Sequence, residues 1–317
     1  MRTPTAPLLQ PRFMGVATFM RLPYQHDPEG LDIALLGVPY DGSVTNRAGT
    51  RHGPRALRDA SSMTRMIHHR TRVNPFEIAR IADIGDVPLT QMYSPEETVK
   101  EIEAFVSNVV AAGAVPLSAG GDHSIAYPLL KAVGADRPVA LIQIDAHADT
   151  LDDFQGSALN HGSPFRRALE AGVIVPEKTI QVGIRGSHNG PAVWDYSAET
   201  GMKILFMEDV VEMGLDAVVA EIRERVGDHP VYLTFDIDAL DPAFAPGTGT
   251  PEIGGFTTRE ALKLVRGLRG LNYIGADLVE VAPPFDSQGI TALAGMTLMY
   301  EMLCHLAESQ SARRATS

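Results

Sequence analysis

The chain has 317 residues, with 27 Lys and Arg against 39 Asp and Glu, which gives a formal net charge of −12, and 44% of its residues are hydrophobic. This composition is that of an ordinary soluble globular protein. The acidic balance and the lack of a Lys/Arg-rich run argue against nucleic acid or an anionic membrane as the main partner.

Cysteine content and the N-terminal sequence bear on the compartment. Cys304 is the only cysteine, which excludes a disulfide framework and a cysteine-based zinc site. The first twenty residues contain no apolar stretch of the kind found in a signal peptide, and no window approaches the ~18 apolar residues of a membrane span. We therefore expect a cytoplasmic protein that does not cross a membrane.

Eight short apolar runs rich in Val, Ile and Leu recur along the chain. Continuous runs of this kind are typical of parallel strands that are buried on both faces. The predicted strands cover residues 32–39, 78–84, 115–118, 139–145, 179–184, 203–207, 231–238 and 272–281.

The segments between these runs carry helix signals. Ser94 is a predicted N-cap, Pro95 stands at the first helical position, and Glu97 completes a capping box before apolar residues at helical spacing. Gly113 closes that segment. A second capping box precedes a predicted helix at residues 257–268.

Alternation of strands and helices predicts a single α/β domain over residues 1–317, built on a parallel sheet with helices on its faces. Residues 1–25 and 310–317, approximately, are expected to be terminal arms. A (β/α)8 barrel and an open doubly wound sheet both fit the number of strands. In either fold, functional residues collect beyond the carboxyl ends of the strands.

Three polar clusters stand where predicted strands end, so all three should lie at one edge of the sheet. A Gly-Gly-Asp-His segment follows the third strand, Asp-x-His-x-Asp follows the fourth, and Asp-Ile-Asp ends the seventh. Their candidate metal ligands are His123, Asp145, His147, Asp149, Asp236 and Asp238.

This ligand set has more oxygen and nitrogen than one tetrahedral zinc ion uses, and it contains no sulfur. It suits two Mn²⁺ or similar divalent ions that share a bridging carboxylate and activate a water molecule for hydrolysis. Each motif alone also has a structural interpretation, such as a turn with a helix-capping Asp122 or a solvated strand end. The three motifs together favour the metal site.

Two further residues are candidates for the chemistry. His161 follows the Asp-rich loop and could pass a proton to a leaving amine. Glu280 ends the last apolar run, where a carboxylate could pair with a planar cation. Their alternative interpretations are a surface histidine and a turn contact before Pro283.

At this point the sequence resembles the ureohydrolase family, which contains arginases, agmatinases and other amidinohydrolases that act on guanidino compounds. The resemblance spans nearly the whole chain. It is carried by residues 46–54, 120–124, 145–149, 234–242, 246–255 and 280–284.

The resemblance implies the three-layer α/β/α sandwich of arginases, with an open eight-stranded parallel sheet. It implies one Mn²⁺ bound by His123, Asp145, Asp149 and Asp236, and a second bound by His147, Asp145, Asp236 and Asp238. It also gives Asp149 a role in orienting a bridging hydroxide, His161 a role in proton transfer, and Glu280 the role of receiving the guanidinium. The implied reaction is hydroxide attack on the guanidinium carbon with release of urea.

The family pattern also bears on the substrate. Leu151, Gly186 and His188 stand where arginases carry residues that bind the α-carboxylate and α-amino groups of arginine, which argues against arginine. The sequence is most similar to the branch that acts on small guanidino acids such as 3-guanidinopropionate or 4-guanidinobutyrate.

Alternatives remain open at this stage. They are an agmatinase and a hydrolase of an N-alkylated guanidine or biguanide, suggested by the apolar Leu159 and possible with Ni²⁺ in place of Mn²⁺. The others are a one-metal zinc deacetylase on a related fold, against which the complete second ligand set argues, and a non-catalytic partner subunit of an active paralogue. Relatives imply a homotrimer or homohexamer. Loops 151–160 and 186–196 are expected to flank the pocket mouth, where Trp194 and Tyr196 either line it or anchor the loop.

Overall fold

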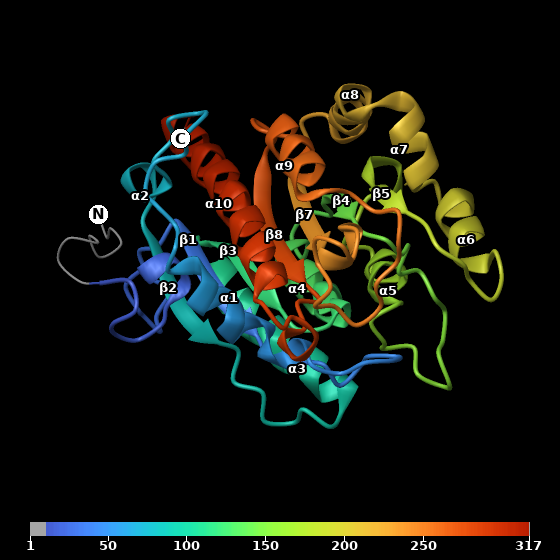
Figure 1. Cartoon of the computed structure of the whole chain (residues 1–317), viewed down its shortest axis with the longest axis horizontal. Coiled ribbons are helices and arrows are strands. Elements are labelled where there is room, and N and C mark those ends of the chain that lie inside the picture. The colour runs from blue at the N-terminus through green and yellow to red at the C-terminus, as the bar shows by residue number, and fades with distance from the viewer. Residues whose placement is uncertain (1–10, 317) are drawn as a thin grey trace.

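A single parallel sheet organises the protein, and the computed structural model describes residues 11–316 of it. The strands are β1 (Ile33–Val38), β2 (Ile81–Asp86), β3 (Val115–Gly120), β4 (Ala140–Ile144), β5 (Ile180–Ile184), β6 (Lys203–Phe206), β7 (Val231–Asp236) and β8 (Tyr273–Val279). Their order is β2-β1-β3-β8-β7-β4-β5-β6, and every neighbouring pair is parallel. The predicted strands are confirmed. Because β2 and β6 stand at opposite ends of this order and do not pair with each other, the sheet is open and not a barrel (Figure 1).

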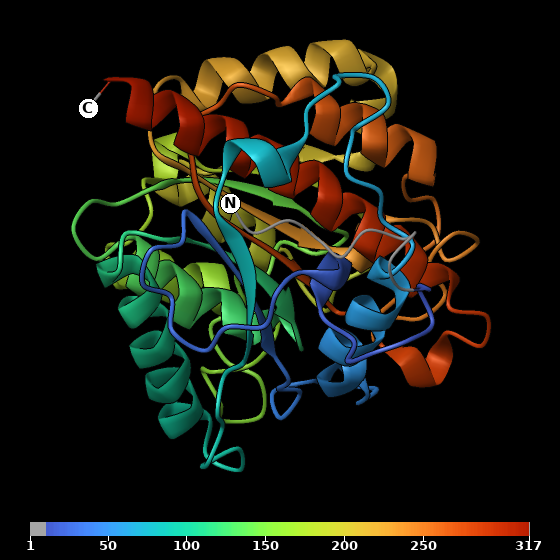
Figure 2. The ribbon, with the colours of Figure 1, turned by 90° about the vertical axis from the view of Figure 1, so that its left-hand side faces the viewer.

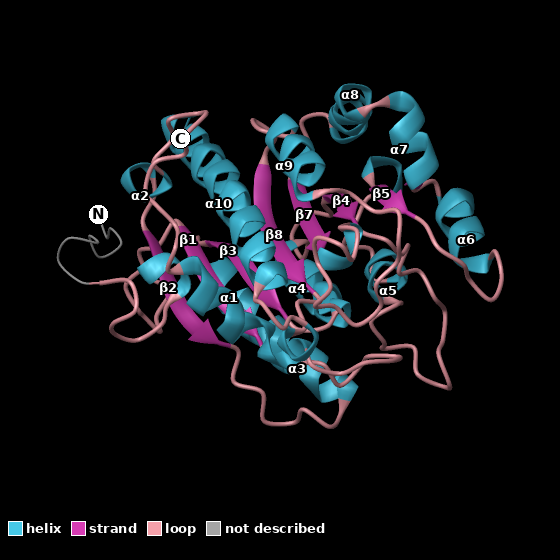
Figure 3. Cartoon of the chain, in the orientation of Figure 1, coloured by secondary structure: helices cyan, strands magenta, loops and turns pink. Residues whose placement is uncertain are grey.

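Helices cover both faces of this sheet (Figure 3). They are α1 (Gly53–Ser61), α2 (Pro75–Ile78), α3 (Pro95–Ala111), α4 (Ala126–Val133), α5 (Pro164–Glu170), α6 (Ala192–Thr200), α7 (Met207–Met213), α8 (Leu215–Val226), α9 (Thr258–Gly267) and α10 (Ile290–Thr316). Figure 2 shows α3, in teal, on one side of the sheet and α10, in red, on the other. The three-layer α/β/α architecture is therefore confirmed.

Each face of the sheet has its own apolar core. Leu57 of α1, Leu264 of α9 and Leu303 of α10 are fully buried in one core, and Leu129 of α4 and Phe165 of α5 are fully buried in the other. Burial of this apolar surface on both faces explains why the strands read as continuous hydrophobic runs in the sequence.

Of the two predicted capping boxes, one is complete in the structure and the other is only half formed. At the start of α9, the Glu260 backbone N–H donates to Thr257 Oγ1 and the Thr257 backbone N–H donates to Glu260 Oε2, so this box is confirmed. At α3, Ser94 accepts the Glu97 backbone N–H at 3.5 Å, but the Glu97 side chain bonds Lys100 instead of returning to Ser94. The reciprocal half of that box was wrong, because the lysine one turn on offers the carboxylate a charged partner.

The chain ends are more integrated than terminal arms of about 25 and eight residues would be. Phe19 and Met20 are fully buried in the core beside α1 and β2, and α10 continues to Thr316. The remainder of the expected N-terminal arm, residues 1–10, lies outside the described residues.

Helix α10 also corrects the expectation that no window of the chain resembles a membrane span. Its residues Ile290–Ala315 are long and apolar enough to cross a membrane by length and composition. However, 72% of the apolar 18-residue window within this helix is buried against the rest of the protein, as in the core helix of a globular fold. Its apolar surface is therefore already used in packing on the sheet.

Strand β7 ends two residues earlier than the run 231–238 predicts. The Asp236 side chain accepts the Asp238 backbone N–H at 2.8 Å and so begins a 3-10 turn, Ile237–Ala239. The turn, and not strand alternation, brings the Asp238 carboxylate to the sheet edge.

Candidate metal centre and pocket

Four neighbouring strands at the centre of the sheet deliver the candidate site. Strands β3, β8, β7 and β4 are adjacent and parallel, so their carboxyl ends meet at one edge. Asp236 is the last residue of β7, and the segments that follow the four strands carry the other five candidate ligands and Glu280, as the sequence predicts.

One group of side chains converges on the ring of His123. Its Nδ1 atom lies 2.9 Å from Asp149 Oδ2, 3.1 Å from Asp145 Oδ2 and 3.3 Å from Asp236 Oδ2. The His123 ring is buried, and despite these distances Nδ1 has no hydrogen-bond partner of good geometry among the described residues. Lone pairs of one nitrogen and three oxygens therefore face a common point.

The partner of the other ring nitrogen fixes the tautomer of His123. Its Nε2 atom is 2.8 Å from Thr234 Oγ1, and the Thr234 hydroxyl donates its single hydrogen to Asp277 Oδ1 at 2.6 Å. Thr234 must therefore accept from His123 Nε2–H. This leaves the Nδ1 lone pair free, which is the arrangement that a metal-ligating histidine requires.

A second group lies beside the first and shares Asp145 with it. His147 Nδ1 is 3.1 Å from Asp238 Oδ2 and 3.6 Å from Asp145 Oδ1. Ligand atoms of His123, Asp145 and Asp149 lie within 4.8 Å of one another, and so do those of Asp145, His147 and Asp238. Asp145 therefore stands between two groups that could each hold a cation.

The buried carboxylates of the cluster would be stabilised by positive charge. Burial, together with the charge on Asp145, raises the pKa of Asp149 to about 6. Burial and the charges of Asp238 and Asp145 raise the pKa of Asp236 well above its usual range. Four carboxylates so close together repel one another unless protons or cations neutralise them.

His161 and Glu280 contact each other beside this cluster. His161 Nδ1 lies 2.9 Å from Glu280 Oε1, which also accepts the backbone N–H of His123 at 2.9 Å. Glu280 Oε2 is buried and has no partner among the described residues. Burial alone would lower the pKa of His161, but the hydrogen bond and charge of Glu280 outweigh it and raise that pKa to about 9.

Two of the candidate residues hold strained backbone conformations. Asp149 has φ of 52° and Glu280 has φ of 63°, in the left-handed region that costs a residue with a side chain roughly 1–2 kcal/mol. Strain of this kind persists where the surrounding structure holds the residue, and here it coincides with the cluster.

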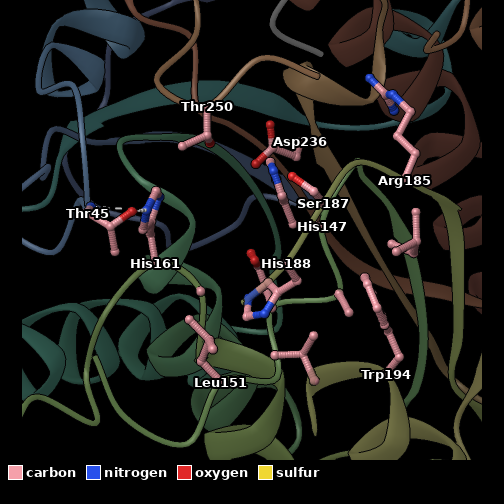
Figure 4. Close-up of a pocket in the computed structure, with 15 residues that line it drawn as sticks. Thr45, His147, Leu151, His161, Arg185, Ser187, His188, Trp194, Asp236 and Thr250 are labelled. Atoms are coloured by element: carbon pink, nitrogen blue, oxygen red, sulfur yellow. Dashed lines mark hydrogen bonds between the residues drawn. The ribbon is translucent and has the colours of Figure 1, made fainter. Parts of the chain in front are cut away.

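A cavity of about 130 Å³ opens onto the cluster (Figure 4). A water molecule occupies ~30 Å³ in the liquid, so the space suits a small molecule. Its deep wall includes His147, Asp149, His161 and Asp236. Glu280 is not itself among the lining residues, but its Oε1 contacts His161, which is.

The outer wall of the cavity comes partly from the two predicted loops. Leu151, His188 and Trp194 line it, and His188 packs edge-on against the Trp194 ring at a centroid distance of 6.1 Å. The predicted loop 186–196 ends at α6, so Trp194 and Tyr196 lie on a helix and not in a loop. Tyr196 does not line the cavity and instead stacks under Arg166. Leu159 faces a different, smaller cavity.

Arg185 is the only arginine that lines this cavity among the described residues, and its guanidinium is fully occupied. It donates to six backbone carbonyls, which are those of Gly183, Asp238, Ala239, Leu240, Glu252 and Ile253. Figure 4 shows the side chain turned away from the centre of the pocket. Arg185 therefore fixes the turn that carries Asp238.

Several supporting residues escaped the sequence analysis. Gln143 donates to Asp145 Oδ2 at 2.7 Å, and Thr234 and Asp277 orient His123. All three are polar residues inside otherwise apolar, fully buried strands, and a polar residue in such a strand is the sequence feature that could have identified them. Asp122 caps the turn after β3, which is the structural role that the sequence suggested for it. It also accepts the Ser43 backbone N–H at 2.9 Å.

Comparison with known proteins shows which family has this fold and this arrangement of residues. The Arginase family model matches residues 31–304, which is most of the chain. The chain belongs to the arginase family. A guanidinopropionase of Pseudomonas aeruginosa is 51% identical over 94% of each chain, and a mitochondrial guanidino acid hydrolase of Homo sapiens is 44% identical over 96% of this chain and 86% of that one.

Solved structures of the arginase family agree with this fold. The proclavaminate amidino hydrolase of Streptomyces clavuligerus matches with a TM-score of 0.91 and 36% identity, over 95% of this chain and all of that one. The resemblance found in the sequence motifs is thereby confirmed, and the likeness extends over the layers and the sheet.

Proposed function

We propose that this chain is an amidinohydrolase that cleaves a small guanidino acid to urea and the corresponding amine, with two divalent cations as cofactor. The observation that carries the proposal is the free Nδ1 of His123, directed at three carboxylate oxygens beside a second His-Asp group that shares Asp145. The relatives named above, two of which are hydrolases of guanidino acids, support the substrate class.

The donor set fits the cofactor. His123, Asp145, Asp149 and Asp236 would hold one cation, and His147, Asp145, Asp236 and Asp238 the other, with Asp145 and Asp236 shared. When bound, the two cations supply Lewis acidity, which lowers the pKa of a shared water molecule and stabilises charge at the reacting carbon. Oxygen and imidazole ligands suit Mn²⁺, our first choice, and also Ni²⁺.

The remaining residues act on the substrate. Glu280 Oε2, buried and unpaired, is available to a guanidinium N–H and would orient the substrate beside the cluster. Asp149 belongs to the cluster and also lines the cavity, and it would orient the attacking water. His161 would deliver a proton to the leaving amine, since its ring both contacts Glu280 and lines the cavity.

The direct test is urea release by the purified protein loaded separately with Mn²⁺ and Ni²⁺. We expect turnover of 3-guanidinopropionate or 4-guanidinobutyrate that exceeds turnover of arginine, agmatine and dimethylbiguanide. Preference for agmatine or the biguanide would replace the guanidino-acid assignment. Two bound metals and no urea from any compound would favour the non-catalytic subunit.

The outer wall of the cavity indicates how the substrate tail is chosen. Among the described residues, the only carboxylates that line the cavity are Asp149 and Asp236, both in the metal cluster, so an ammonium tail finds no dedicated partner. Arg185 is occupied by carbonyls. His188, Ser187 and the Trp194 indole therefore offer side-chain donors for a tail carboxylate, and His188 alone among them can carry a positive charge.

Changing His188 to Asp should reverse this preference. We expect kcat/KM for guanidinopropionate to fall about 10-fold or more and that for agmatine to rise, because like charges repel and opposite charges attract across the wall. Propylguanidine, whose tail is uncharged, is the control and should change less than about 3-fold. Equal losses for all three compounds would show that His188 does not select the tail.

We further expect the protein to be cytoplasmic and to assemble as a homotrimer or homohexamer. Both expectations come from the sequence and its family resemblance. Gel filtration with light scattering would measure the assembly.

A further inference from the structure

The loop after β1 brings Thr45 against the proton-transfer histidine. Thr45 Oγ1 lies 2.7 Å from His161 Nε2, and the Thr45 backbone N–H donates to the same nitrogen at 3.1 Å. Figure 4 shows the two side chains facing each other at the cavity wall, and both residues line the cavity. Thr45 and the imidazole of His161 therefore share one part of the cavity wall.

This loop is held in place from two sides. The backbone N–H of His161 donates to the Ser43 carbonyl at 3.0 Å, and the backbone N–H of Ser43 donates to the buried carboxylate of Asp122 at 2.9 Å. The position of Thr45 relative to the ring is therefore built into the fold and does not depend on a flexible side chain alone.

The two contacts at Nε2 suit different protonation states of His161. A neutral ring that gives its Nδ1 hydrogen to Glu280 has a lone pair at Nε2, and the Thr45 backbone N–H fits that state. A protonated ring has a hydrogen at Nε2, and only an acceptor fits that state. The Thr45 hydroxyl both donates and accepts, so it can pair with Nε2 in either state, whereas the backbone N–H pairs with the neutral ring alone.

We propose that Thr45 is a positioning residue for the reaction. Its hydroxyl accepts the Nε2–H of protonated His161 and, once that proton has passed to the leaving amine, donates its own hydrogen to the Nε2 lone pair until the ring regains a proton from water. This rests on the proposed function, because it presumes that His161 protonates the leaving amine. A general acid must pass through both states in every turnover.

The charged groups around His161 agree with this role. Glu280 from the end of β8 contacts Nδ1, and Asp122 after β3 and Asp149 after β4 act through space. Together they offset burial and raise the pKa of His161 to about 9, which favours the imidazolium that a general acid requires. That form needs the acceptor that the Thr45 hydroxyl supplies.

The test compares Thr45→Val, which keeps the shape but removes the hydroxyl, with Thr45→Ser, which keeps the hydroxyl. For the metal-loaded enzyme with guanidinopropionate, we expect Thr45→Val to lower kcat about 10-fold or more, with KM changed less than about 3-fold. We also expect the alkaline limb of its pH profile to move to lower pH, since the imidazolium has lost its acceptor. Thr45→Ser should restore both within about 3-fold.

A second measurement does not depend on activity. In protein loaded with diamagnetic Zn²⁺ and labelled with ¹⁵N-histidine, the His161 titration should move to lower pH in Thr45→Val and return in Thr45→Ser. An unchanged Thr45→Val enzyme, or a Thr45→Ser enzyme as impaired as Thr45→Val, would overturn the proposal. If the unaltered protein releases no urea, the proposed function fails, and the titration alone decides whether the hydroxyl stabilises the imidazolium.

Discussion

Changing Glu280 to Gln should lower kcat/KM for the guanidino substrate about 100-fold or more, while both metals remain bound. Glutamine keeps the size of the side chain but removes the charge that faces His161 and the unpaired Oε2 that would receive the guanidinium. The pKa of His161 should also fall from about 9, because Glu280 makes the largest contribution that opposes burial. Steady-state kinetics, metal analysis and the pH profile measure these effects.

The chain offers a matched control for this variant in Glu301. Glu301 is another buried carboxylate paired with a histidine, since it lies 3.0 Å from His68 Nε2, and it also bonds Arg266. It is remote from the cavity lining, so Glu301→Gln should lower stability but leave kcat/KM within about 3-fold. A Glu280→Gln enzyme as active as the unaltered one, with two metals bound, would remove Glu280 from the site.

The arrangement of the strands was largely accessible from the sequence, because burial on both faces leaves a simple pattern of apolar runs. The order of the strands and whether the sheet closes into a barrel could not be predicted, because eight strands fit a barrel as well as an open sheet. Only the pairing of β3 with β8 and β8 with β7 places Glu280 between the motifs at His123 and Asp236. The first pairing joins Leu117 to Ala276 and the second joins Phe235 to Leu278, and contacts between residues so far apart in the chain leave no local signal.

The metal ligands were likewise recognisable, since they stand in short motifs at strand ends. The residues that orient them were harder to find. Thr45 lies 116 positions before His161, and a threonine in a polar loop has no distinguishing pattern. Asp277 is different, because a carboxylate within a buried apolar strand already demands an internal partner, which the structure shows to be Thr234 and Tyr232. The capping box predicted at Ser94 is incomplete, because the side chain of Glu97 pairs with the charged Lys100 instead.

Removing the metals with a chelator should destabilise the protein at neutral and alkaline pH, because Asp145, Asp149 and Asp236 then repel one another. A ligand present at 100 times its dissociation constant adds ~2.7 kcal/mol per site. In a chain of this size, its loss lowers the melting temperature by roughly 5 °C or more. Melting curves of metal-loaded and chelator-treated protein at pH 8 measure the difference.

The pH dependence of the metal-free protein provides a sharper test. In the folded protein the pKa of Asp149 is raised to about 6 and that of Asp236 is also raised, above the ~3.9 of an unfolded Asp. The folded state therefore binds these protons more tightly, and the stability they confer is lost as pH rises through about 6. Metal-free protein should melt at a higher temperature at pH 5.5 than at pH 8, whereas metal-loaded protein should show the opposite order, since protons compete with cations for the carboxylates.

Asp145→Asn separates this effect from general acid sensitivity. Asn keeps the shape of the side chain that the two ligand groups share but removes its charge, so we expect fewer than two bound metals and a weaker pH dependence of the metal-free melting temperature. Asp41→Asn is the control, because Asp41 is buried and accepts the Gly49 backbone N–H at 2.7 Å, outside the cluster. If Asp145→Asn retained two metals and the unaltered pH dependence, Asp145 would not bridge the two sites.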